Sequence, residues 1–348
     1  MALRFGDSEL VADTHTDKRE LLTSLLQQTS RSFYLTLRVL PRQVRPQIGL
    51  AYLLARTTDT IADSEIVPVE QRLRALQQLR ERILGLRNTV LDFAEIAGHQ
   101  GEPAERLLLE KCDQSLTLLS NLSADDLKRL REVLKTIISG QELDLQRFAT
   151  ASFESIIALQ NEAELDDYTY RVAGCVGEFW TKMCRAHLFP KAKLDESELF
   201  ARAVRFGKGL QLVNILRDLP ADLRKGRCYL PADKLTHDGL QAADLLQPFN
   251  VGKFSRSYHR YLDLAQAHLA DGWEYTNMIP RGQVRVRLAC AWPILIGLET
   301  IRRLRTENVL DPGRRVKISR ADVRQIIIRS VLCYPSTSAW RKLAPLSA

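Results

Sequence analysis

The sequence predicts an all-α fold, and three observations lead to that prediction. Apolar residues recur at spacings of three and four in the long segments, which is the period of an amphipathic helix. Almost no segment alternates apolar and polar residues in the manner of a half-buried strand. Breakers such as "PRQVRP", "LFPKAK" and "DPGRR" fall between the periodic segments. We expect helices over residues 18–29, 42–62, 68–87, 103–120, 124–149, 163–188, 196–219, 255–277, 283–306 and 320–333.

The expected helix over residues 42–62 leads into a pair of acidic residues. The stretch "LLARTTDTIADSE" carries Asp59 and Asp63 four residues apart in an otherwise apolar run. In a helix this spacing places both carboxylates on the same face, about 6 Å apart along the axis. The two negative charges therefore repel each other.

The starts of the next helices carry recognisable signals. Pro68 stands at a first-turn position of "PVEQRLRALQQLRERIL", where its missing N–H costs nothing. Ser123 precedes "ADDLKRL" as a helix cap, and acidic residues follow in the first turn.

The expected helix over residues 163–188 contains two glycines, Gly174 and Gly177. Each weakens a helix by nearly 1 kcal/mol relative to alanine. We expect that a neighbouring helix or a substrate chain approaches closely at this point.

A second acidic pair lies in "GLQLVNILRDLPADLRKGRCYLP", where Asp218 and Asp222 have the same spacing as the first pair. Asn214 lies four residues before Asp218, and Gln211 three residues before that. The three side chains therefore share one helical stripe within an apolar segment.

Two carboxylate pairs in apolar helices indicate a cation site. Removing a charge from water without a partner costs several kcal/mol, and neighbouring carboxylates add repulsion. Mg²⁺ prefers hard oxygen ligands, accepts one or two carboxylates, and completes its octahedron with water and phosphate oxygens. A single pair at this spacing is weak evidence. Two pairs with arginines beside them predict a site for metal-bound diphosphate.

Bulk composition sets the class of protein. The 348 residues carry a formal net charge of +8, which indicates an anionic partner. We expect a cytoplasmic protein because no apolar run is long enough to span a membrane and the N-terminus lacks a signal peptide. The six cysteines lack CxxC spacing, so we expect reduced, mostly buried thiols. We expect a flexible segment over 1–17, a single domain over 18–335 and a C-terminal tail over 336–348.

Four motifs, in order, resemble the squalene and phytoene synthases, the head-to-head prenyl transferases: "TSRSFYLTLRVLP", "YLLARTTDTIAD", "YTYRVAGCVGEFW" and "LQLVNILRDLPADLRKGRCYLP". The resemblance runs from about Ser30 to Lys317. It implies an all-α isoprenoid-synthase bundle around a central apolar cavity, with two facing aspartate-rich helices. It also implies prenyl diphosphate substrates and Mg²⁺, or Mn²⁺ in its place.

The resemblance also implies the roles of individual residues. The metal ligands are Asp59, Asp63, Asp218 and Asp222. The diphosphate-binding residues are Ser30, Arg31, Ser32, Phe33, Arg56, Gln211, Asn214, Arg217 and Arg227. Arginine suits this role because its planar fork can bind phosphate oxygens through two hydrogen bonds. Tyr168 matches the family's catalytic tyrosine, which stabilises an allylic cation and assists proton removal, and Tyr170 is its rival.

The late motifs favour one branch of the family. "ACAWP" and "RRVKIS" resemble elements of squalene synthases, which reduce presqualene diphosphate with NADPH, although Ala289 and Ser319 depart from the usual residues. The expected NADPH contacts are Asn214, Lys317, Ser319 and Arg320. The expected function is squalene synthesis from two farnesyl diphosphates. The alternative is a presqualene diphosphate, dehydrosqualene or phytoene synthase without the reductive step.

The interactions of such an enzyme follow from the same resemblance. Its partners would be small prenyl diphosphates rather than nucleic acid, because the arginine-rich helices carry no RNA-binding motif. We expect a monomer that contacts the membrane only peripherally, when it releases its product.

Overall fold

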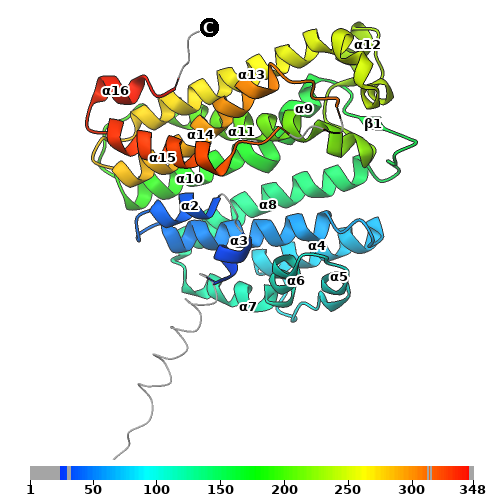
Figure 1. Ribbon diagram of the computed structural model, residues 1–348. Helices are drawn as coiled ribbons and strands as arrows, with labels where there is room; N and C mark the ends of the chain where they lie inside the picture. The colour runs from blue at the N-terminus through cyan, green and yellow to red at the C-terminus, as the bar shows by residue number, and fades with distance from the viewer. Residues whose placement is uncertain (1–23, 30–32, 312, 314–315, 345–348) are drawn as a thin grey trace, which may run out of the picture. The chain divides into compact units, whose positions relative to one another are not determined.

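A computed structural model of the chain describes residues 24–29, 33–311, 313 and 316–344 (Figure 1). Residues 24–29 are helical. The following α-helices are α2 Phe33–Val39, α3 Arg45–Ala62, α4 Val69–Leu84, α5 Ala94–Gly98, α6 Pro103–Glu110, α7 Cys112–Thr117, α8 Ala124–Arg147, α9 Glu162–Thr169, α10 Cys175–His187, α11 Glu196–Arg224, α12 Ala232–His237, α13 Val251–Met278, α14 Val284–Leu304, α15 Arg320–Cys333 and α16 Thr337–Arg341. The shorter elements are the 3₁₀ turns η1 Leu118–Asn121, η3 Ala242–Leu246 and η4 Pro248–Asn250, the π turn η2 Tyr170–Gly174, and the strands β1 Ile157–Ala158 and β2 Arg227–Cys228.

The chain forms two compact units. The first contains the described residues of Met1–Arg38 and Val44–Ile138, and the second those of Val39–Gln43 and Ser139–Ala348. Helix α8 begins in the first unit and ends in the second. The expected single domain over 18–335 stays a prediction.

In the first unit, α3 packs on α4, α6 and α7. Leu53, Leu54 and Ile61 are fully buried on its apolar face. The buried hydroxyl groups of α3 need partners, and Thr57 and Thr60 donate to carbonyl oxygens one turn earlier in the helix, at 2.9 and 3.0 Å. The helix therefore stays apolar and hydrogen-bonded up to the first acidic pair.

In the second unit, α11 is the central helix and packs against α10, α13 and α14. Helix α15 lies along α14 (Figure 1). The largest fully buried side chains here are Phe254, Tyr261, Trp273 and Tyr275. Strands β1 and β2 pair in parallel, with Ile157 opposite Arg227 and Ala158 opposite Cys228. Five of the six cysteines are buried, as the sequence predicted.

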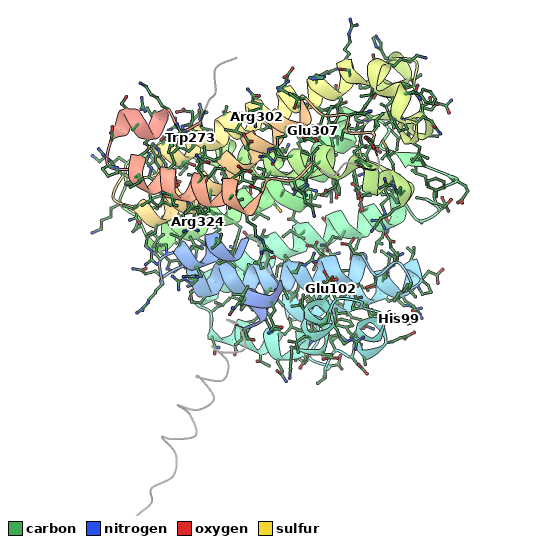
Figure 2. All side chains as sticks on the ribbon, in the orientation of Figure 1. His99, Glu102, Trp273, Arg302, Glu307 and Arg324 are labelled. Atoms are coloured by element: carbon green, nitrogen blue, oxygen red, sulfur yellow. The ribbon has the colours of Figure 1, made fainter. Side chains whose placement is uncertain are left out.

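The C-terminal helix α16 falls in the expected tail. The indole ring of Trp340 stacks on that of Trp273, which is labelled in Figure 2, with centroids 5.1 Å apart. The guanidinium carbon of Arg287 lies 5.2 Å from the Trp340 ring centroid. Arg287 and Trp340 both donate to the side-chain oxygen of Asn277, at 2.8 and 2.9 Å. These contacts fix α16 to α13 and α14.

Besides small shifts at helix ends, three of the expected helices differ from the structure. The helix expected over 103–120 is divided into α6, α7 and η1, and no residue at the break signals it. The helix expected over 163–188 contains the π turn η2, in which the Cys175 N–H bonds the Tyr170 carbonyl five residues back. The helix expected over 196–219 continues through Pro220 to Arg224, and the Tyr258 hydroxyl bonds the carbonyl that the proline leaves without its helical donor.

The expected close approach at Gly177 is confirmed, and the neighbour is helix α11. A Cβ atom at Gly177 would lie 2.0 Å from the backbone oxygen of Ala203. The reverse contact occurs at Gly207, where a Cβ would lie 2.2 Å from the Ala173 oxygen. Glycine therefore allows the backbone of α11 to approach those of α10 and η2 closely.

No helix within the described ranges has the length and apolar character needed to cross a membrane.

Replacing Gly177 with alanine should lower the free energy of unfolding by about 3 kcal/mol, because the added methyl meets backbone rather than a movable side chain. Gly252→Ala is the matched control. It lies in α13 with nothing within 4 Å of an added Cβ, and should leave stability unchanged or raise it by about 0.5 kcal/mol. Urea denaturation measures both, and equal effects would contradict a tight crossing.

Candidate functional site

The first aspartate pair lies at the end of α3. Asp63 is the residue after the last helical one, and its N–H donates to the Asp59 carbonyl oxygen at 2.8 Å. The pair therefore keeps the helical spacing that the sequence predicted. The Asp59 side chain is 47% exposed, and Asp63 is exposed. The two carboxylates therefore lie outside the buried apolar face of the helix.

Arg56 lies one turn before this pair and contacts carboxylates on two helices. Its guanidinium bonds Glu105 of α6 and lies 3.9 Å from Asp59. Burial lowers the pKa of Arg56, but Asp59, Glu105 and other nearby groups raise it, and the net shift is upward. Arg56 is therefore a fixed cation beside Asp59, and it could exchange Glu105 for a phosphate oxygen.

The polar stripe predicted on α11 is confirmed. Gln211 and Asp218 are half-buried and Asn214 is exposed, whereas Leu212, Ile215 and Leu219 are buried. The helix therefore separates a polar stripe from an apolar face.

Arg217 and Asp218 form a fork-to-fork ion pair. Arg217 Nε donates to Asp218 Oδ1 at 2.9 Å, and Nη2 donates to Oδ2 at 2.5 Å. The Asp218 hydrogen bond raises the pKa of Arg217 against the lowering effect of burial. A cation that binds Asp218 must compete with this arginine, and a phosphate group must compete with this aspartate.

Asp222 lies one turn further, in a region rich in negative charge. Burial, together with the charges of Asp218 and Asp144, raises its pKa to about 7, although Arg227 and Lys225 oppose the shift. This carboxyl group therefore keeps its proton to a higher pH than an ordinary aspartate, and a nearby cation would favour its charged form.

A glycine turn brings Arg227 to the acidic cluster. Gly226 has φ +78°, and a Cβ there would lie 2.4 Å from the backbone of Ser152. Only glycine fits such a turn without strain. It reverses the chain between α11 and β2, and places Arg227 where its charge acts on Asp222.

Two residues of this cluster were missed by the sequence analysis. The Tyr229 hydroxyl donates to Asp144 Oδ2 of α8 at 2.9 Å. Tyr229 follows Arg227 within the quoted motif "GRCYLP", which could have indicated it. Asp144 carries no local signal, because its partner lies 85 residues away.

The two candidate tyrosines have different surroundings. The Tyr168 side chain is buried and stacks on Tyr229, with ring centroids 4.7 Å apart and planes 22° apart. Tyr170 instead donates to Glu178 at 3.2 Å, and its ring lies 5.8 Å from the Lys208 ammonium. Only Tyr168 therefore belongs to the group that contains Tyr229 and, through it, Asp144.

The remaining predicted site residues lie elsewhere. Ser30, Arg31 and Ser32 fall outside the described residues, and Phe33 is the first residue of α2. Lys317, Ser319 and Arg320 are exposed. The Ser319 hydroxyl caps α15 by accepting from the Asp322 N–H at 3.1 Å, and Arg303 donates to the Lys317 carbonyl at 2.7 Å. These contacts explain the "VKIS" segment as the start of a helix.

The donor chemistry at the end of α11 fits magnesium. Two carboxylates share one stripe, and burial, with the nearby charges of Asp218 and Asp144, raises the pKa of Asp222, so a bound cation would favour its charged form. Within the described ranges, no three His, Cys, Asp or Glu side chains are grouped to hold a metal ion. A cation at either pair would therefore take its other ligands from water and phosphate.

Comparisons with known proteins identify similar sequences and a similar fold. The family model described as squalene/phytoene synthase matches residues 26–322. A presqualene diphosphate synthase from Rhodopseudomonas palustris is 34% identical over 254 residues, or 73% of this chain and 77% of the relative. One from Sinorhizobium fredii is 29% identical over 303 residues, or 86% and 93%. The solved structure of TcSQS with a ligand has a TM-score of 0.76 at 21% identity, and the match covers 94% of this chain and 90% of that chain. The predicted all-α isoprenoid-synthase fold is confirmed.

The raised pKa of Asp222 predicts a pH-dependent stability in metal-free protein. The folded-state pKa is about 7 and the ordinary value is 3.8, so the folded chain binds more protons between these limits. Its contribution to stability should therefore be present below pH 4 and fall as the pH rises to about 7. Urea denaturation of Asp222→Asn should show the variant gaining stability over the wild type at pH 7.5 more than at pH 5. An equal difference at both values would contradict the shift.

Proposed function

Because the chain belongs to the squalene/phytoene synthase family of prenyl transferases, we propose that it joins two prenyl diphosphates head to head. The names of two relatives, both presqualene diphosphate synthases, support farnesyl diphosphate as substrate and presqualene diphosphate as product. The observation that carries the proposal is the acidic cluster at the end of α11, where Asp222 meets other carboxylates beside two arginines.

The proposed reaction balances without a further reactant. The C–O bond to diphosphate breaks in one farnesyl diphosphate, and the double bond of the second molecule attacks the resulting allylic cation. Loss of one proton closes the cyclopropane ring. The products are presqualene diphosphate, inorganic pyrophosphate and a proton.

The aspartate pairs would hold the leaving group through Mg²⁺, with Mn²⁺ as a substitute. The bound cation supplies the positive charge that makes diphosphate a stable leaving group. The residues that would hold it are Asp59, Asp63, Asp218 and Asp222.

The arginines and amides would bind phosphate oxygens. Arg56 and Arg217 now pair with carboxylates, and would transfer hydrogen bonds to diphosphate when a cation neutralises those partners. Gln211, Asn214 and Arg227 lie along or next to the same helix, and Ser30, Arg31, Ser32 and Phe33 would contribute from the first motif.

We assign the catalytic tyrosine to Tyr168. Its ring stacks on Tyr229, which donates to Asp144, so its position is defined by packing rather than by a surface contact. A buried phenol ring can stabilise a neighbouring cation through its π face, and the hydroxyl can accept or pass a proton.

The reduction to squalene by NADPH stays a prediction. It depends on the late motifs with Lys317, Ser319 and Arg320, and on Asn214. Ser319 and the Lys317 carbonyl have structural contacts at the start of α15. The first half-reaction is therefore the function that we propose.

Product identification tests the proposal. Purified protein is incubated with Mg²⁺ and farnesyl diphosphate, with and without NADPH, and the lipid products are identified by mass spectrometry. Presqualene diphosphate and pyrophosphate are expected in both reactions. Squalene that forms only with NADPH would add the reductive step. Absence of pyrophosphate release from both farnesyl and geranylgeranyl diphosphate would refute the function.

Replacing Tyr168 with phenylalanine should reduce kcat for product formation by about 10²-fold or more, because the hydroxyl takes part in proton transfer. Tyr170→Phe is the matched control. It removes only a bond to Glu178, so kcat should change by less than about threefold. A larger loss at Tyr170 than at Tyr168 would reverse the assignment.

A further inference from the structure

The stretch of α11 between Asp218 and Asp222 lacks one helical hydrogen bond. Pro220 has no backbone N–H, so the Leu216 carbonyl, four residues earlier, loses its helical donor. Leu216 is fully buried, and water cannot take over the bond. An interruption of the helix at Pro220 would therefore fall between Asp218 and Asp222.

A side chain from another helix supplies the missing donor. The Tyr258 hydroxyl of α13 donates to the Leu216 carbonyl oxygen at 3.1 Å. The direction of the bond is fixed, because a carbonyl oxygen only accepts. Tyr258 is 3% exposed, and burial raises its pKa, so the hydroxyl keeps its proton at neutral pH.

We propose that Tyr258 is a positioning residue for the second aspartate pair. Its hydrogen bond keeps α11 helical through Pro220, and thereby keeps Asp218 and Asp222 one turn apart on one stripe. The inference rests on the proposed function, since it takes the pair to be the site of metal-bound diphosphate.

Packing alone does not explain a tyrosine at this position. Tyr261 lies three residues further along α13 and is equally buried, at 1% exposure. Its hydroxyl has no hydrogen-bond partner within the described part of the chain. The same helix therefore contains one buried tyrosine whose hydroxyl holds α11 and one whose hydroxyl does not, and Tyr261→Phe is the matched control.

The first test measures the helix in metal-free protein. Amide hydrogen exchange at residues 221–224 should become about tenfold faster in Tyr258→Phe, because one hydrogen bond that holds the segment is lost. Tyr261→Phe should exchange like the wild type. The double variant Tyr258→Phe with Pro220→Ala should recover protection, because alanine restores the N–H that bonds the Leu216 carbonyl. Unchanged exchange in Tyr258→Phe would overturn the proposal.

The second test separates positioning from general stability. Calorimetry measures the binding of Mg²⁺ with inorganic pyrophosphate. Tyr258→Phe should bind several-fold more weakly, whereas Tyr261→Phe and the double variant should bind like the wild type. Faster exchange with unchanged binding would make Tyr258 merely structural and overturn the proposal.

The two tests also separate this proposal from the function on which it rests. If the wild type binds no Mg²⁺–pyrophosphate, the proposed function and the positioning role both fail. The hydrogen-exchange result would then show only how α11 stays helical beyond Pro220.

Discussion

The partial burial of carboxylates at the end of α11 is the constraint on which the candidate site depends. Asp222 lies near Asp218 and Asp144, and burial together with these charges raises its pKa to about 7. Three neighbouring features compensate this negative charge. Arg217 pairs with Asp218, the Tyr229 hydroxyl donates to Asp144, and the turn at Gly226 places Arg227 nearby. A cation bound at this cluster would favour the charged form of Asp222.

Much of this arrangement could be predicted from local sequence. Helical periodicity identified the long helices, since one apolar face repeats over many turns. The spacing of Gln211, Asn214 and Asp218 gave the correct stripe, because side-chain direction follows from helix geometry alone. The two glycines of the third motif indicated a close contact, and at Gly177 the partner is the backbone of α11.

The remaining features depend on contacts distant in sequence. Helix α11 continues through Pro220 to Arg224, where the Tyr258 hydroxyl of another helix bonds the carbonyl that lacks its helical donor, so local rules ended the helix five residues too early. Asp144 enters the cluster through Tyr229, 85 residues away. Helices α5, α12 and α16 have five or six residues, too few to show a period. Ser319 lies in a segment that resembles a cofactor motif, but it also caps α15, and spacing does not distinguish these roles.

The central claim is that both aspartate pairs bind divalent cation and diphosphate. Crystals grown with Mn²⁺ and a non-hydrolysable thiol analogue of farnesyl diphosphate would test it directly through the anomalous signal of manganese. The account predicts manganese bonded to carboxylate oxygens of Asp59 or Asp63 and to those of Asp218 or Asp222, with diphosphate oxygens completing the coordination. Manganese bound elsewhere, or diphosphate held without either aspartate pair, would contradict it.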